Sequence, residues 1–252
     1  HDLPGVGENL HDHLQIRLMY KVKNTVTLNE RTHSLIGKMA MGLEYLFFRT
    51  GPLTMPPSQL GAFARSDPSQ ASPNIEWHVQ PLSLEKFGEP LHPFPAITPS
   101  VCNLRPTSRG HVRIKGSDPQ AHPAIKLNYL STEEDKRVAV DSIHMTRRIM
   151  KAKALQKYQP EEFKPGPGIA TDEALRKAAG DLGTTIFHPV GTCKMGRDPL
   201  AVVDDRLRVH GVQGLRVIDA SVMPRITSGN TNAPVTMIAE KGAQMLLEDN
   251  KP

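Results

Sequence analysis

The chain has 252 residues, of which 38% are hydrophobic and 23% charged, and its formal net charge at pH 7 is +5. These values are ordinary for a globular protein with one large core or two modest ones. No apolar run approaches the roughly 18 residues that a membrane span needs, and no Lys/Arg block with interleaved aromatic residues indicates nucleic-acid binding.

The amino-terminal stretch HDLPGVGENLHDH contains two glycines spaced as at the start of a dinucleotide-binding loop. That loop needs the spacing G-x-G-x-x-G between a strand and a helix. Leu10 stands at the third glycine position, and the alternating residues 14–23 predict a strand instead of a helix. We therefore expect a turn at Gly5 and Gly7. Because the chain begins with His1 inside this segment, we also expect a fragment or a processed chain.

His11 and His13 have the spacing of a metal-ligand pair, and the cysteines are Cys102 and Cys193. Side chains two apart on a strand share a face, but no carboxylate or thiol cluster in the sequence completes a site around the two histidines. Two distant cysteines form neither a CxxC motif nor a disulfide framework, which suits a reducing compartment. We therefore expect no metal site.

The middle of the chain predicts strands and one helix. Residues 33–49 place Ile36, Met39, Leu43 and Phe47 on one stripe, which predicts an amphipathic helix. Residues 51–73 read as a loop, 75–79 as a strand and 81–99 as an irregular segment. The stretches VCNLRP, HVRIKG and AIKLNYL then predict three more strands separated by turns.

The second half predicts helices and one buried strand. Ser131 and Glu134 form a capping-box pair that opens a helix over about residues 132–156. YQPEEFKPGPG reads as a linker, and Thr171–Ala179 as a short helix stopped by Gly180. LRVIDAS (215–221) predicts a buried strand, and Pro234 marks the start of a last helix. Short turns between the central strands favour antiparallel pairing.

Two stretches contain residues suited to chemistry. In FHPVGTCKMG (187–196), Pro189 biases His188 toward an extended backbone, and histidine is the side chain suited to proton transfer near neutrality. In SGNTNAPV (228–235), Asn230 precedes the amino end of a helix, which attracts electron-rich groups. Taken alone, a turn with a structural histidine explains the first stretch equally well. An ordinary helix start explains the second stretch, which is weak evidence by itself.

Taken together, three stretches carry more weight. They are LPGVGENLHDH, RPTSRGHVRIKGSDPQAHPAIKLNYL, and the run from HPVGTCKMG to RVIDASVMPRITSGNTNAPVTMIAEK. In this order they resemble the glucose–methanol–choline (GMC) family of flavin oxidoreductases, nearest to its choline dehydrogenase and alcohol dehydrogenase branch. The resemblance covers nearly the whole chain but lacks the amino-terminal glycine loop that grips FAD, so the chain looks like the second half of a family member.

The resemblance implies an α+β fold, in which an antiparallel sheet backed by helices accompanies the C-terminal part of an FAD-binding α/β domain. It places residues 1–19 and 185–252 in the FAD-binding domain and residues 20–165 in a substrate-binding domain. Residues 166–184 would form a linker with a short helix. The missing amino-terminal half, or a second copy of the chain, would complete the enzyme.

The resemblance also implies site residues. His188 would act as the base and Asn230 would bind the substrate oxygen, while the alcohol gives a hydride to flavin N5. The implied FAD contacts are Asp219, Ala220, Asn230, Thr231 and Asn232, with Asn232 and Pro234 shaping the turn that faces the flavin. The implied substrate contacts are Phe187, Trp77 and His78.

The expected function is therefore FAD-dependent oxidation of a primary alcohol, choline-like or aliphatic, to an aldehyde. A non-catalytic substrate-domain fragment or binding module without FAD is the alternative. The expected partner is a small-molecule alcohol and not nucleic acid. We expect a cytoplasmic location, which agrees with the reducing compartment that the two cysteines suit. The basic charge suits either a solvated face or an anionic membrane, so peripheral association with the inner membrane is left open.

Overall fold

The computed structural model describes residues 1–56 and 58–250 and separates into two compact units. Unit 1 comprises residues 1–14, 104–136 and 185–252, and unit 2 comprises residues 15–103 and 137–184. Residues 104–136, which the sequence analysis places in a substrate domain over 20–165, therefore belong with the two ends of the chain. The reason is backbone pairing, since Val112 N–H donates to the Gly7 carbonyl at 2.7 Å and Leu10 N–H to the Gly110 carbonyl at 3.0 Å.

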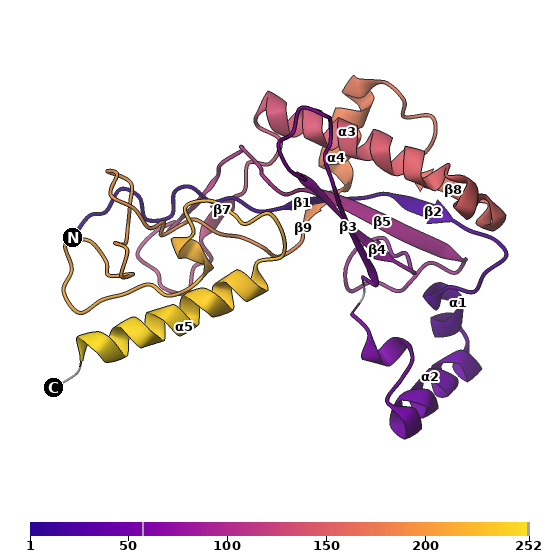
Figure 1. Ribbon diagram of the computed structural model, residues 1–252, viewed down its shortest axis with the longest axis horizontal. Helices are drawn as coiled ribbons and strands as arrows, with labels where there is room; N and C mark the ends of the chain where they lie inside the picture. Colours follow the sequence, from indigo (N-terminus) through magenta and orange to yellow (C-terminus); the bar gives the residue numbers. More distant parts are fainter. Residues whose placement is uncertain (57, 251–252) are drawn as a thin grey trace. The chain divides into compact units, whose positions relative to one another are not determined.

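A seven-stranded sheet forms the centre of unit 2, with the order β3-β4-β5-β1-β9 and with β2 joining β5 to β8 (Figure 1). The pairs formed by β4 and β5 and by β1 and β5 are antiparallel. The strands are β1 (Leu14–Arg17), β2 (Met19–Lys21), β3 (Leu60–Ala64), β4 (Ile75–Gln80), β5 (Ala96–Asn103), β8 (Glu161–Lys164) and β9 (Gly183–Thr185). The predicted antiparallel sheet is confirmed. Both β3 and β8 lie in segments that the sequence analysis treats as loop or linker, and short strands there find partners only in the folded sheet.

Helix α3 (Glu133–Met150) runs along one face of this sheet (Figure 1). The indole N–H of Trp77 on β4 donates to the Thr146 hydroxyl of α3 at 2.8 Å. Trp77 and Val79 line an apolar cavity of about 390 Å³ on this side. Because neighbouring residues of a strand face opposite ways, His78 lies on the other face of the sheet.

Two helix ends differ from their predicted positions. Helix α3 ends at Met150 and is followed by the 3-10 turn η2 (Lys153–Tyr158), where one helix over 132–156 is predicted. Helix α4 (Asp172–Leu182) is found where a helix over 171–179 is predicted, with Thr171 as its cap, but it passes through Gly180 and ends at Leu182. A glycine inside a helix weakens it without stopping it when the flanking turns are packed, as Leu175 and Ala179 are here.

The predicted helix over 33–49 is found as α2 (Leu35–Phe48), and the short α1 (Leu28–His33) precedes it. The extended Ser34 separates the two helices and caps α2 by accepting from Gly37 N–H at 3.2 Å. The apolar stripe of α2 does not face the core. Ile36, Met39, Leu43 and Phe47 are exposed, and Met41 is the buried residue of α2. A 3-10 turn, η1 (Pro52–Thr54), follows this apolar helix. None of the described helices is both long and apolar enough to cross a membrane.

Unit 1 contains the hairpin β6 (His111–Arg113) and β7 (Ala124–Lys126), the 3-10 turn η3 (Ala220–Val222) and helix α5 (Asn232–Asp249). The strand predicted at 215–221 is wrong, since Arg216 makes one isolated bridge to Arg208 before the chain turns into η3. A hydrophobic core nevertheless holds the segments together. Its members include Val190, Val203, Val222, Ile226 and Ile238.

Candidate active site

The amino-terminal segment 9–13 joins the two stretches that contain the predicted catalytic residues. His11 and Val190 exchange backbone hydrogen bonds of 3.1 and 2.9 Å. The His11 ring accepts from Ile226 N–H at 2.9 Å, so residues just ahead of SGNTNAPV are tied to the same segment. Asn9 adds side-chain bonds of 3.3 Å to the carbonyls of Gly191 and Pro224. All these contacts lie within unit 1.

Gly191 explains why this motif needs a glycine. Its φ of +98° is a conformation that L residues with a side chain rarely adopt. A Cβ at this position would overlap the Asn9 carbonyl and lie 2.9 Å from the His11 ring. The close approach of the two backbones at Gly191 therefore holds the His188 segment against residues 9–13.

The carboxylate of Asp12 is buried and organises the chain around His188. It accepts hydrogen bonds from the backbone N–H groups of His13 at 2.8 Å and His188 at 3.0 Å. The hydroxyls of Thr185 and Tyr129 each donate to it at 2.5 Å. Burial, reinforced by the Asp12 charge, raises the pKa of Tyr129, so the phenol stays a donor. The Asp12 carboxylate thus connects the backbone of His188 to Thr185, to Tyr129 and to the backbone of His13.

His13 and His188 form a pair of imidazoles, with Nδ1 atoms 3.1 Å apart and rings nearly perpendicular at 82°. Nε2 of His13 lies 3.2 Å from the Leu104 carbonyl, which only accepts, so Nε2 carries the proton. A neutral His13 then accepts at Nδ1, and His188 donates from its own Nδ1. The hydrogen-bond network therefore assigns the basic lone pair of His188 to Nε2.

Phe187 precedes this imidazole in an unusual conformation. Its φ is +66°, which is strained for a bulky residue, and its side chain is 69% exposed. A hydrogen bond from its N–H to the Thr185 hydroxyl at 2.8 Å supports the turn. Strain of this kind is concentrated at functional sites. The Phe187 ring lies at the surface next to the half-buried His188, where it is accessible to a bound ligand.

The predicted cofactor residues lie on two neighbouring turns. Asp219 caps η3 by accepting from Ser221 N–H at 2.8 Å, and Ser221 and Val222 pair through their carbonyls with the N–H groups of Cys193 and Met195 at 2.9 and 2.8 Å. At the start of α5, Thr231 makes no side-chain cap, Asn230 is exposed, and the nearby Thr227 hydroxyl is buried without a partner among the described residues. Uncapped N–H groups at a helix start suit an electron-rich ligand.

The structure brings the His188 stretch and the Asp219–Asn230 stretch to the same segment, 9–13. A direct approach of His188 to Asn230 stays a prediction. Asp12 and His13 are the residues that the sequence analysis missed, because it weighed His13 only as a metal ligand. Trp77 and His78 belong to unit 2, where Trp77 is a core residue of the α3 face. Their role as substrate contacts also stays a prediction.

His11, the other half of the predicted metal pair, has a structural role. Its Nδ1 lies 2.6 Å from the Asn9 carbonyl, and its Nε2 accepts from Ile226. Burial lowers the pKa of His11 from 6.5 to about 4. The ring is therefore neutral at physiological pH and joins residues 9 and 226.

Comparison with known sequences identifies relatives over nearly the whole chain. The profile of the family described as GMC oxidoreductase matches residues 106–239. The oxygen-dependent choline dehydrogenase of Escherichia coli (strain UTI89 / UPEC) is 45% identical over 246 residues, which is 98% of this chain and 44% of that protein. The enzyme of the same name from strain SE11 is 44% identical with the same coverage. The chain thus spans less than half the length of these relatives.

Solved structures share the fold. Pyridoxine 4-oxidase from Mesorbium loti is 27% identical and superposes with a TM-score of 0.82, covering 100% of this chain and 45% of that chain. A formate oxidase structure from Aspergillus oryzae RIB40, from a study of FAD modification, is 24% identical with a TM-score of 0.87, covering 99% and 48%. At that identity the second similarity concerns the fold alone.

Proposed function

The chain belongs to the GMC oxidoreductase family, and from that premise we propose that it is the catalytic part of an FAD-dependent enzyme that oxidises a primary alcohol to an aldehyde. The substrate is choline-like or aliphatic. The observation that carries the proposal is the series Leu104 carbonyl, His13, His188, in which each imidazole is held by a hydrogen bond of 3.1 or 3.2 Å.

His188 removes the hydroxyl proton. A carbon-bound hydrogen leaves with its electron pair readily only when the neighbouring oxygen has alkoxide character, so a base at this oxygen lowers the barrier. Nδ1 of His188 is engaged with His13, and Nε2 is therefore the atom that accepts the proton. His13 is a positioning residue, which sets the tautomer and ring angle of His188. Asn230 binds the substrate oxygen from the other side.

FAD, when bound, supplies the acceptor for the hydride at its N5. The residues of unit 1 fit such a group, because the buried Thr227 hydroxyl and the uncapped start of α5 offer unpaired polar groups beside the predicted contacts. We assign Asp219, Ala220, Thr231 and Asn232 to holding it. The positive end of α5 then stabilises negative charge on the ring system.

We further propose that unit 1 is the cofactor side of the enzyme and unit 2 the substrate side. Phe187, exposed beside His188, forms an apolar wall of the substrate site. The partner of this chain is an amino-terminal FAD-binding half of the kind that the relatives' greater length accommodates.

The test is turnover by the complete flavoprotein with choline and aliphatic primary alcohols. His188→Ala should lower kcat by about 10²–10⁴-fold, the usual contribution of a general base, with bound flavin and melting temperature unchanged. The exposed His122→Ala is the control. Near-normal turnover by His188→Ala contradicts the assignment. A wild-type protein that takes up no flavin supports the non-catalytic module instead.

His13 has its own test. His13→Ala should reduce kcat less than His188→Ala does. It should also shift the limb of the kcat/KM–pH profile that reports deprotonation of His188, because the His188 ring loses the acceptor of its Nδ1 proton. His13→Gln, whose amide both accepts and donates, should restore part of the loss. A pH profile identical to wild type in His13→Ala would remove the positioning role.

We also propose that α2 binds peripherally to an anionic lipid surface. The exposed apolar residues of α2 lie beside the exposed cations Arg31, Lys38 and Arg49. Glu30 and Glu44, which accept from Thr27 N–H and the Thr50 hydroxyl, keep their negative charge, so the three cations outnumber the acids by one. Apolar residues flanked by an excess of cations are typical of helices that lie in a membrane interface.

The measurement is co-sedimentation with vesicles of phosphatidylglycerol and phosphatidylcholine. Binding should be lost on pure phosphatidylcholine and in an Ile36→Ser/Phe47→Ser variant, and kept in the control Ile114→Ser, whose exposed side chain lies elsewhere. If the double variant binds as wild type does, α2 is not the contact. Loss of exposure in the complete protein, measured by labelling, would show that the amino-terminal half covers α2.

A further inference from the structure

The face of the sheet opposite α3 carries buried polar atoms that have no hydrogen-bond partner in the described part of the chain. On β4 they are Glu76 Oε2, His78 Nε2 and Gln80 Oε1. The neighbouring strands add Ser100 Oγ on β5 and the Nε and Nη2 atoms of Arg17 on β1. Unpaired buried polar atoms are costly and rare, so their concentration on one face indicates a ligand.

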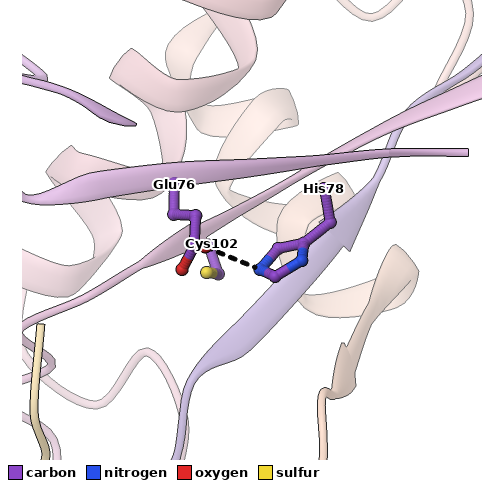
Figure 2. A group of neighbouring side chains, drawn as sticks. All are labelled: Glu76, His78 and Cys102. Atoms are coloured by element: carbon purple, nitrogen blue, oxygen red, sulfur yellow. Dashed lines mark ion pairs between the residues drawn. The ribbon is translucent and has the colours of Figure 1, made fainter. Parts of the chain in front are cut away.

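Three residues of this face have side chains that converge (Figure 2). Glu76 of β4 is paired with Cys102 of β5 in the sheet register, and His78 lies two residues further along β4 on the same face. One ligand atom from each residue lies within 4.8 Å of the other two. Glu76 is 4% exposed and Cys102 is 0% exposed, so the sheet holds two of the three groups in its interior.

The spacing of Glu76 and His78 fits a shared cation. Oε1 of Glu76 and Nε2 of His78 are 3.4 Å apart, yet His78 Nε2 makes no hydrogen bond among the described residues. Two ligands at about 2.0–2.1 Å from a tetrahedral zinc are separated by roughly 3.3 Å. The two atoms are therefore spaced as two neighbouring ligand atoms of one tetrahedral zinc ion.

We propose that Glu76, His78 and Cys102 bind one Zn²⁺ ion in unit 2. Oxygen, nitrogen and sulfur donors together suit zinc and disfavour the hard cations Mg²⁺ and Ca²⁺. On binding, the Cys102 S–H bond breaks, a Zn–S bond forms and the proton leaves to solvent. One carboxylate, one thiolate and one neutral imidazole balance the two positive charges, so the occupied site is neutral. His78, the partly exposed member, lies at the entrance.

Two features separate this site from a simple ion pair. A His–Glu ion pair would be completed by a hydrogen bond, which the geometry lacks, and it would leave the second oxygen of Glu76 unpaired in the interior. Zinc satisfies both groups and adds the thiolate. The sequence analysis weighs only His11 and His13 as a metal pair and expects no metal site. Glu76, His78 and Cys102 become neighbours only when β4 and β5 pair. The inference involves neither His188 nor Asn230. It assigns His78 as a metal ligand in place of the substrate contact that the resemblance implies.

Cobalt is the probe for the test. The reduced chain, stripped of metal by a chelator, is titrated with Co²⁺ and followed by its thiolate-to-cobalt absorption band in the near ultraviolet. We expect saturation at one equivalent and loss of the band on addition of Zn²⁺. Cys102→Ala should abolish the band, whereas Cys193→Ala, the matched control on the other cysteine, should keep it.

His78→Ala is the second variant, because its partly exposed side chain can be removed without opening the core. Its Kd for Zn²⁺, measured by competition with a chromophoric chelator, should rise by at least about tenfold, the loss that even an outer-sphere partner causes. Circular dichroism checks that each variant is folded. Absence of the band in the wild type, its survival in Cys102→Ala, or an unchanged Kd in His78→Ala overturns the proposal.

Discussion

Single residues far apart in sequence determine the environment of His188. Asp12 holds its backbone and His13 its ring, and both come from the first segment of the chain. The sequence indicates that a histidine followed by proline has a restricted backbone, but it does not show which groups the ring meets. Asp12 and His13 lie in the LPGVGENLHDH stretch that supports the family resemblance. The sequence therefore marks this stretch as important, but it does not show that the two residues contact His188.

At this scale, His11 predicts a pH dependence. The folded pKa of His11 is about 4, below its ordinary value of 6.5. Between these pH values the unfolded chain binds a proton that the folded chain does not, so stability falls as the pH is lowered. The full loss is roughly 3 kcal/mol, since one pKa unit corresponds to about 1.4 kcal/mol.

Denaturant unfolding between pH 7 and pH 4 measures the effect. The free energy of unfolding of wild type should decrease more steeply than that of His11→Gln, which does not titrate, and His122→Gln should follow wild type. NMR titration of the His11 ring gives a second readout. Equal slopes for wild type and His11→Gln, or a ring that titrates near pH 6.5, would refute the buried neutral state.

At the scale of elements, the sequence pattern predicts strand β4 correctly but does not predict that this strand packs against α3. The alternation of Ile75, Trp77 and Val79 predicts a strand, and β4 is found there. The same alternation places Trp77 against α3 and His78 on the opposite face. Helix α2 gives the converse case, because an apolar stripe predicts a buried face and only a partner can bury it.

The Trp77–Thr146 bond makes this contact testable. Thr146→Val keeps the shape of the side chain but leaves the buried indole N–H unsatisfied, so the free energy of unfolding should fall by about 1–3 kcal/mol. Thr236→Val, on the exposed face of α5, should change it by less than about 0.5 kcal/mol. Urea unfolding followed by Trp77 fluorescence measures both. Similar small effects in the two variants would show that the bond contributes little.

At the scale of the whole molecule, the family prediction from three separate stretches is confirmed, since the GMC oxidoreductase profile covers residues 106–239 and the choline dehydrogenases align over 98% of the chain. The same alignment covers 44% of those proteins. The chain contains no G-x-G-x-x-G loop, and its Gly7 is instead enclosed between Val112 and Thr192 in a backbone turn.

The chain by itself should therefore bind FAD weakly or not at all, because the loop and helix that hold the pyrophosphate of a dinucleotide are absent from its sequence. Titration of the purified chain with FAD, followed by flavin fluorescence and equilibrium dialysis, measures this. Addition of an amino-terminal half from a relative should restore stoichiometric binding. A yellow chain that retains one FAD through gel filtration would disprove the prediction.

The sequence by itself determined the family, the antiparallel sheet and the identity of His188 and Asn230 as candidates, because motifs and alternation are local and survive in the order of residues. Tertiary structure decided what these residues touch. Residues 104–136 join unit 1, Asp12 and His13 meet His188, and Glu76 and His78 meet Cys102, since each of these contacts depends on backbone pairing between segments that are distant in the chain. Pairing partners are set by packing of the complete chain, and no local pattern encodes them.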